Sequence, residues 1–137
     1  WRAEVWGVYG GAPPTWRARE LIGPDLVAYS TRGTMNCILQ CLGLGWSGYI
    51  PDDCHNTVVA VPINLAWLAW GWPNLFVERM HSVGTEVILL GPYGAGDPGT
   101  AGIDTMAQLA QVPESFVGYL WTNRIEEIGP AFRARDK

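Results

Sequence analysis

Two polar residues that could bind a ligand, Asn123 and Arg124, come directly after the last strand predicted from the sequence. Residues 117–122 alternate in a pattern typical of a buried strand. Asn123 is expected to cap the next helix, because Glu126 three residues later completes a capping box. In a parallel α/β sheet this corner lies at the carboxyl ends of the strands, where ligands bind. A solvated arginine beside a capped helix is an equally good interpretation.

Other combinations of reactive residues are sparse. The sequence contains no G-x-S-x-G motif, and the glycine-rich loop 91–99 has neither the GK[ST] ending nor the Rossmann spacing of a phosphate-binding loop. His55 and His81 have no partner at metal-ligand spacing, so we expect surface or hydrogen-bonded histidines. Asp52 and Asp53 are adjacent acids in a turn-rich loop, where solvation is the expected state.

The three cysteines leave two alternatives open. Cys37 and Cys41 lie four residues apart on a predicted helix, and Cys54 lies in the loop that returns from it. A disulfide from either helical cysteine to Cys54 would close a loop of about 13 to 17 residues and stabilise the fold by roughly 3 kcal/mol. It would imply an oxidising compartment such as the periplasm. Three buried thiols are slightly favoured on sequence alone, and a zinc site would lack a fourth ligand.

Composition indicates one α/β domain. The chain has 137 residues, of which 48% are hydrophobic, and a net charge of −4. Nine scattered basic residues argue against a nucleic-acid partner. The sequence begins at Trp1 inside a predicted strand, which we interpret as a removed signal peptide or a missing part of the domain. A periplasmic or secreted location is predicted, with a cytoplasmic one as the alternative.

Strands and helices are expected to alternate along the whole chain, which predicts a parallel sheet with right-handed crossovers. Gly129 and Pro130 are expected to interrupt the last helix. The predicted strands span residues 4–9, 26–29, 57–63, 86–90 and 117–122, and the predicted helices span 13–22, 30–42, 73–81 and 103–110, with the last beginning at 123.

Residues 56–77 carry no charge, which raises the question of a membrane span. Pro62, Pro73 and the asparagines would be expensive in lipid, so an aromatic loop over residues 65–72 is the better interpretation. This loop is expected to pack on its own domain, to cover a pocket, or to touch a membrane surface, since tryptophan favours membrane interfaces.

Five strand–helix units fit two architectures. A doubly wound five-stranded sheet suits 137 residues. A (β/α)8 barrel has eight units in about 250 residues, so this chain would be its C-terminal portion. The abrupt N-terminus and the missing nucleotide fingerprint after the first strand favour the incomplete barrel, and we predict that fold.

Three segments then carry a family resemblance. GYLWTNRIEEIGP resembles the closing strand of glycerophosphodiester phosphodiesterases, which commonly ends in T-D-R-P where this chain has residues 122–125. Residues 74–90 resemble the helix and strand before it, although Gly91-Pro92-Tyr93 replaces the usual W-T-V-N. Residues 45–76 look like a divergent bacterial branch of the family. The resemblance covers most of the chain with moderately specific motifs.

The resemblance implies a pocket wall without the catalytic set. Its substrate-binding residues would be Tyr93, Trp121, Asn123 and Arg124, acting on a phosphodiester or phospholipid-derived small molecule. The family's H-R-G and its acidic partners are absent, so no catalytic or metal-binding residue is assigned here. A divalent metal, Mg²⁺ or Ca²⁺, would have its ligands in the N-terminal barrel half.

Residues 1–137 would then be a single incomplete domain, inactive by itself, of an enzyme that hydrolyses glycerophosphodiesters to glycerol phosphate and an alcohol. The alternative is a non-catalytic module that binds lipid or sugar through exposed tryptophans. Its expected contacts are Trp46, Trp67, Trp70 and Trp72.

Overall fold

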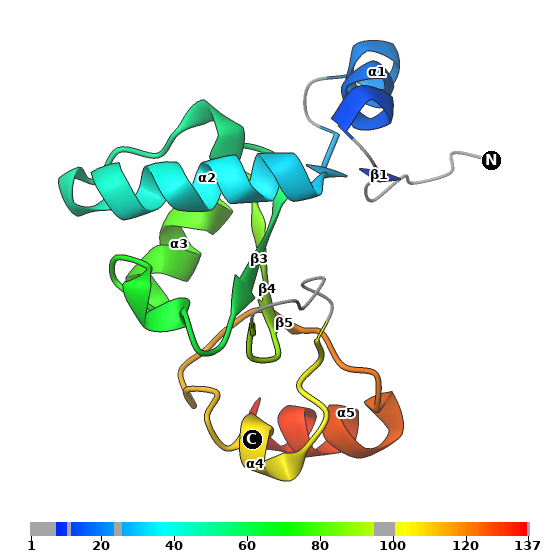
Figure 1. Cartoon of the computed structure of the whole chain (residues 1–137), viewed down its shortest axis with the longest axis vertical. Coiled ribbons are helices and arrows are strands. Elements are labelled where there is room, and N and C mark those ends of the chain that lie inside the picture. Colours follow the sequence, from blue (N-terminus) through cyan, green and yellow to red (C-terminus); the bar gives the residue numbers. More distant parts are fainter. Residues whose placement is uncertain (1–7, 11, 24–25, 95–100, 137) are drawn as a thin grey trace.

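The computed structural model describes residues 8–10, 12–23, 26–94 and 101–136. Within them the chain is a mixed α/β structure with two groups of parallel strands (Figure 1). One group is the pair β1 (Val8–Tyr9) and β2 (Ala28–Tyr29). The other is a sheet of β3 (Val58–Pro62), β4 (Glu86–Leu90) and β5 (Tyr119–Leu120), paired in chain order.

A helix follows each strand, as the sequence predicts. The start of the first predicted strand, residues 4–7, lies outside the described residues. The helices are α1 (Ala12–Ile22), α2 (Thr31–Leu44), α3 (Asn74–Ser82), α4 (Met106–Leu109) and α5 (Ile125–Arg133), with short 3-10 turns at Gly45–Ser47, Asp52–Cys54, Ala66–Leu68 and Ala134–Asp136.

Side chains join the β1–β2 pair to the larger sheet. The hydroxyl of Thr57 donates a hydrogen bond of 2.7 Å to the carbonyl of Ala28, and the Ala28 amide donates to the carbonyl of Asn56. The Arg19 guanidinium of α1 donates to the carbonyls of Leu26, His55 and Asn56. One arginine therefore ties the first helix to the chain before β2 and before β3.

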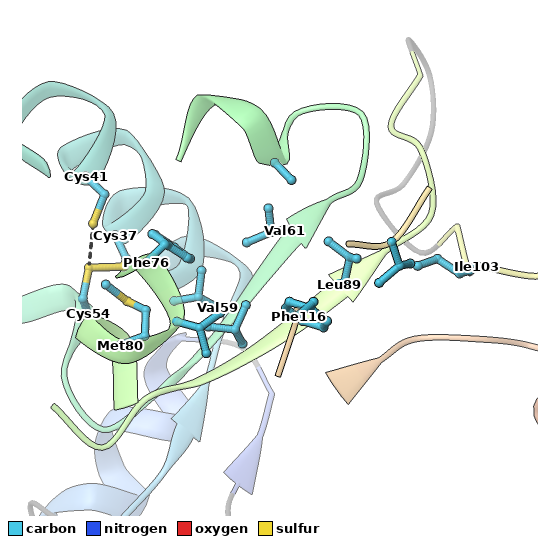
Figure 2. Packing of buried hydrophobic residues seen from close by; sticks show 14 of the residues in the cluster. Cys37, Cys41, Cys54, Val59, Val61, Phe76, Met80, Leu89, Ile103 and Phe116 are labelled. Atoms are coloured by element: carbon cyan, nitrogen blue, oxygen red, sulfur yellow. Dashed lines mark hydrogen bonds between the residues drawn. A yellow bond between two sulfur atoms is a disulfide. The ribbon is translucent and has the colours of Figure 1, made fainter. Parts of the chain in front are cut away.

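The core lies on one face of β3 and β4. Val59 and Val61 of β3 and Val87 and Leu89 of β4 are buried, because alternate strand residues point toward α2 and α3. Figure 2 shows the same core continuing past Leu89 toward Phe116 and Ile103. Residues on the opposite face, such as Ala60 and Ile88, are only half-buried.

The last strand differs from the prediction. β5 contains two residues instead of six, and Tyr119 and Val117 are exposed to 58% and 69%. The strand pairs with β4 on one side, and the amide of Ile103 donates to the carbonyl of Trp121 beyond its end. A short, exposed edge strand fits these contacts, whereas the sequence pattern predicted a buried strand.

The predicted capping box at Asn123 is wrong. α5 has Arg124 at its N-cap position and no side-chain cap bond. The Asn123 side chain donates its NH2 to Asp104. The predicted interruption at Gly129–Pro130 is also wrong, since α5 continues through Pro130 to Arg133. Burial of Ile128 in the core holds the helix in place despite the proline.

The fourth helix begins later than predicted. Thr105 is its N-cap, and a capping box with Gln108 starts a helix of four residues at Met106. Ile103 lies outside the helix and is fully buried. The apolar periodicity of residues 103–110 therefore came partly from a buried residue in the preceding loop.

Candidate functional site

An apolar pocket of about 560 Å³ lies where β2, β3 and β4 end, beside α2. This volume is in the range of pockets that hold small molecules. Its lining comes from the ends of three parallel strands, one face of α2, and the loop after β3. The lining residues are Tyr29, Thr31, Thr34, Met35, Ile38, Leu39, Cys41, Leu42, Ala60, Val61, Pro62, Leu65, Leu68, Ala69, Phe76, Leu90 and Tyr93.

The sequence of α2 explains how its wall is positioned. The Ser30 hydroxyl accepts a hydrogen bond of 3.1 Å from the Gly33 amide and caps the helix. Thr34, Ile38 and Cys41 then recur at helical spacing and line the pocket. The Thr34 hydroxyl donates 2.8 Å to the Val58 carbonyl, which fixes α2 on β3 and occupies the hydroxyl proton.

Exposed tryptophans lie in the turns on either side of this region. Trp46 is exposed to 68%, Trp67 to 73% and Trp70 to 49%. Each indole N–H already donates to a backbone carbonyl, of Gly43, Asn64 and Leu42 respectively. The rings of these tryptophans are therefore exposed to solvent, while their indole N–H groups are already hydrogen-bonded within the protein.

Trp72, the fourth tryptophan predicted as a contact, belongs to the interior. Its ring stacks on Phe116 with 5.3 Å between the ring centroids and tilts against Phe76 at 6.1 Å. It packs against the core, so it is a structural residue of the loop before α3.

The four residues predicted to bind substrate follow the carboxyl ends of β4 and β5 and fall into two groups. Tyr93 follows β4, and its backbone exchanges two hydrogen bonds, of 2.8 and 2.9 Å, with the Asn64 side chain. Tyr93 also lines the apolar pocket. Trp121 continues β5, and its amide donates 2.9 Å to the Leu89 carbonyl.

Asn123 and Arg124 form the second group, which is arranged around Asp104. The Asp104 carboxylate accepts from the Asn123 amide at 2.7 Å, from the Asn123 side chain at 3.0 Å and from the Thr122 hydroxyl at 3.1 Å. These hydrogen bonds, first among them that of the Asn123 side chain, hold the pKa of Asp104 below its ordinary value. Sequence reasoning missed Asp104 as a residue of this site, because nothing local in the sequence marks it as the acceptor.

The Arg124 guanidinium forms ion pairs with acidic side chains of the helix that it precedes. Its guanidinium lies 2.5 Å from the Glu127 carboxylate and 3.8 Å from that of Glu126, and all three side chains are exposed. A phosphate group would have to compete with these two acids for the arginine.

The cysteines converge on one point under α2 (Figure 2). Cys37 and Cys54 form a disulfide, and the thiol of Cys41 lies 3.5 Å from the Cys54 sulfur. The structure thus selects one of the pairings that the sequence left open and excludes three free thiols. Burial raises the pKa of the Cys41 thiol, and the nearby Arg79 guanidinium partly offsets this effect.

The structure places His81, Asp52 and Asp53 on the surface and His55 just beneath it. His81 pairs with Glu86 at 3.3 Å on the surface. His55 is half-buried, and Asp53 accepts 2.7 Å from Gln40 in solvent. Within the described ranges, the group of metal-binding residue types with ligand atoms close together is the three cysteines. Sulfur ligands do not suit Mg²⁺ or Ca²⁺, which prefer oxygen.

Comparisons with known proteins leave the family open. No family model, no curated protein and no solved structure matches this chain. Among the described residues, no helix combines the length and apolar character needed to cross a bilayer.

Proposed function

We propose that this chain binds a lipid-like ligand whose apolar chain enters the pocket between α2 and the carboxyl ends of β2, β3 and β4. The observation that carries this proposal is the lining of the pocket, which is almost wholly aliphatic and aromatic. Burying apolar surface contributes about 25 cal/mol per Å² of area removed from water. A sugar would need several polar partners, and the Thr34 hydroxyl proton is already used within the protein.

The tryptophans support a lipid over a sugar for the same reason. Sugar-binding aromatic residues act together with free donors and acceptors, whereas the indole donors of Trp46, Trp67 and Trp70 are bonded to the backbone. Rings of this kind favour the boundary between water and a lipid surface. Membrane-surface contact through these rings is therefore part of the proposal.

The test is a titration of the chain with a fluorescent polyene fatty acid, read by energy transfer from tryptophan. Leu39 lines the pocket and is exposed to 60%, so Leu39→Gln places an amide there without opening the core. We expect affinity to fall about tenfold, since an unpaired amide costs roughly 1–3 kcal/mol in apolar surroundings. Equal affinity of wild type and Leu39→Gln would contradict the proposal.

Leu44→Gln is the matched control, because Leu44 lies on the same helix, is exposed to 44%, and does not line the pocket. Its affinity is expected to stay at the wild-type value. A titration with a disaccharide is expected to leave the tryptophan emission unchanged. A saturable change with the sugar instead would favour the sugar-binding alternative.

A second candidate function is the one that the resemblance implies. In it the chain is the C-terminal portion of a (β/α)8 phosphodiesterase barrel, and the lipid pocket holds the apolar part of a glycerophosphodiester substrate. The sequential order of parallel strands supports this proposal, since neighbouring strands of such a barrel follow in chain order. The half-buried apolar residues Ala60, Ile88 and Leu90 also support it, because they would face a barrel interior completed by the N-terminal half.

Under this second proposal the chain alone does not hydrolyse its substrate. Cleavage needs a metal on the phosphoryl oxygens and a proton donor for the leaving alcohol. Arg124 cannot donate a proton at neutral pH. We expect no release of choline from glycerophosphocholine with Mg²⁺ or Ca²⁺. EDTA-sensitive turnover by these 137 residues would show that catalytic residues lie within them.

We further propose that the protein is periplasmic or secreted. The disulfide supports this location, because such bonds persist in oxidising compartments. The cytoplasmic alternative predicts reduced cysteines in protein taken from cells. Alkylation of thiols at the moment of lysis, followed by mass measurement, separates the two.

A further inference from the structure

Three cysteine sulfurs lie within 4.8 Å of one another, all on buried residues. Cys37 and Cys41 project from successive turns of α2, four residues apart, and Cys54 reaches them from the turn before β3 (Figure 2). Zinc binds thiolates at about 2.3 Å, so tetrahedral ligands lie about 3.8 Å apart. The 3.5 Å between Cys41 and Cys54 is close to that spacing.

Hydrogen bonds also hold the segments that carry these cysteines, in addition to the disulfide. The Thr34 hydroxyl fixes α2 on β3, and the Thr85 hydroxyl donates to the carbonyl of Cys54. The Cys54 amide donates 2.9 Å to the Pro51 carbonyl and closes the turn. Reduction of the disulfide would therefore leave three neighbouring thiols on segments that these hydrogen bonds still hold in place.

We propose that the reduced protein binds one Zn²⁺ through Cys37, Cys41 and Cys54. Reduction by an external dithiol cleaves the Cys37–Cys54 bond, gives two thiols and leaves the reductant as a cyclic disulfide. A phosphine does the same with one water molecule, which supplies the oxygen of the phosphine oxide and the two thiol protons. Binding then replaces three S–H protons, which are released to solvent, with three Zn–S bonds. The disulfide and the zinc complex exclude each other, so the redox state decides which one forms.

The fourth coordination position distinguishes this site from a closed structural one. Among the described residues, no histidine, aspartate or glutamate joins the three sulfurs. A set of three protein ligands with one open position is the arrangement of catalytic zinc sites, and water fills the open position at rest. Cys41 also lines the apolar pocket, so one ligand of the proposed ion borders it.

The local charge suits this assignment. Three thiolates and Zn²⁺ sum to a single negative charge, and the positive charge of the Arg79 guanidinium acts on the Cys41 sulfur. Arg79 is held there by a hydrogen bond of 2.8 Å from its Nη1 to the Gly45 carbonyl. The zinc proposal rests on the cysteine geometry and does not depend on the lipid proposal.

The experiment uses the full chain reduced with a phosphine under argon and titrated with Zn²⁺ against a chromophoric chelator. Co²⁺ in place of Zn²⁺ provides an optical signature, the thiolate-to-cobalt charge-transfer absorption. We expect one ion per chain, and no binding by the oxidised protein. If the reduced protein binds neither Zn²⁺ nor Co²⁺, the proposal is wrong, whether or not the reduced chain remains folded.

Two variants separate ligation from folding. Cys41→Ser retains the Cys37–Cys54 disulfide, so the protein is folded before reduction. We expect this variant to bind Zn²⁺ more than about 100-fold more weakly. Removing a residue that only hydrogen-bonds a metal ligand typically costs about 10- to 100-fold, so a larger loss indicates direct ligation. His55→Ala is the matched control, because His55 is a metal-ligand type next to Cys54 but outside the cluster. Unchanged affinity of Cys41→Ser, or an equal loss in His55→Ala, would contradict the assignment.

Discussion

The side chain of Asn123 donates a hydrogen bond of 3.0 Å to the carboxylate of Asp104, nineteen residues earlier in the chain. This bond joins the loop before α4 to the corner between β5 and α5. Asn123 is thereby held by Asp104 one residue before the N-cap of α5, which is Arg124 and makes no side-chain cap bond. A candidate ligand-binding residue therefore has a structural partner of its own.

The Asp104 network predicts a pH dependence of stability. The folded state lowers the pKa of Asp104, so the native protein binds fewer protons than the unfolded chain. The stabilisation is complete above the unfolded pKa of about 3.9 and is lost as pH falls through the lower folded value. Urea unfolding of Asp104→Asn at pH 7 should show a loss of about 1 kcal/mol that shrinks as the pH falls below about 4. Glu114→Gln, at an exposed position, is the control, and a loss independent of pH would argue against the carboxylate.

The disulfide is expected to stabilise the fold by about 3 kcal/mol, because it closes a loop with a sequence separation of 17. Cys37→Ser should lower the free energy of unfolding by that amount in the absence of metal. Cys41→Ser should lower it by less, since Cys41 is outside the bond. Equal losses from the two variants, measured by urea unfolding without reductant, would place the disulfide elsewhere.

Arg19 is expected to be the residue of α1 that matters most for stability. Arg19→Ala leaves three carbonyls without their charged donor, and we expect a loss of about 1–2 kcal/mol. Arg17→Ala is the matched control on the same helix, at an exposed position. Thermal unfolding of the two variants provides the comparison, and similar values would show that the carbonyl bonds contribute little.

Two glycine-to-alanine substitutions should have opposite signs. Gly84 has a φ of +73°, and a Cβ there would meet the side-chain oxygen of Asn56, so Gly84→Ala should destabilise by about 2 kcal/mol. Gly43 lies in α2 with open space around it, so Gly43→Ala should stabilise by up to about 1 kcal/mol. Denaturant midpoints of the two proteins test the pair, and destabilisation by Gly43→Ala would mean that α2 is not helical at this position.

The sequence by itself determined the order of strands and helices. The β-branched run of β3, the apolar run of β4 and the serine before α2 encode their structures locally, through strand propensity and a side-chain cap. The alternation of these elements then predicted parallel pairing, which the three-stranded sheet confirms. These features need only neighbours within a few residues, so they can be recognised in a single sequence.

The tertiary structure decided what no local pattern contains. The Asp104 carboxylate accepts a hydrogen bond from the side-chain NH2 of Asn123 across nineteen residues, and α5 begins after Arg124, whose side chain makes no cap bond. Cys37 and Cys41 could each pair with Cys54, at separations of 17 and 13 residues, and the packing of α2 on β3 selects Cys37. The pocket likewise exists because three strand ends and one helix face meet in space, a relation set by packing rather than by the order of residues.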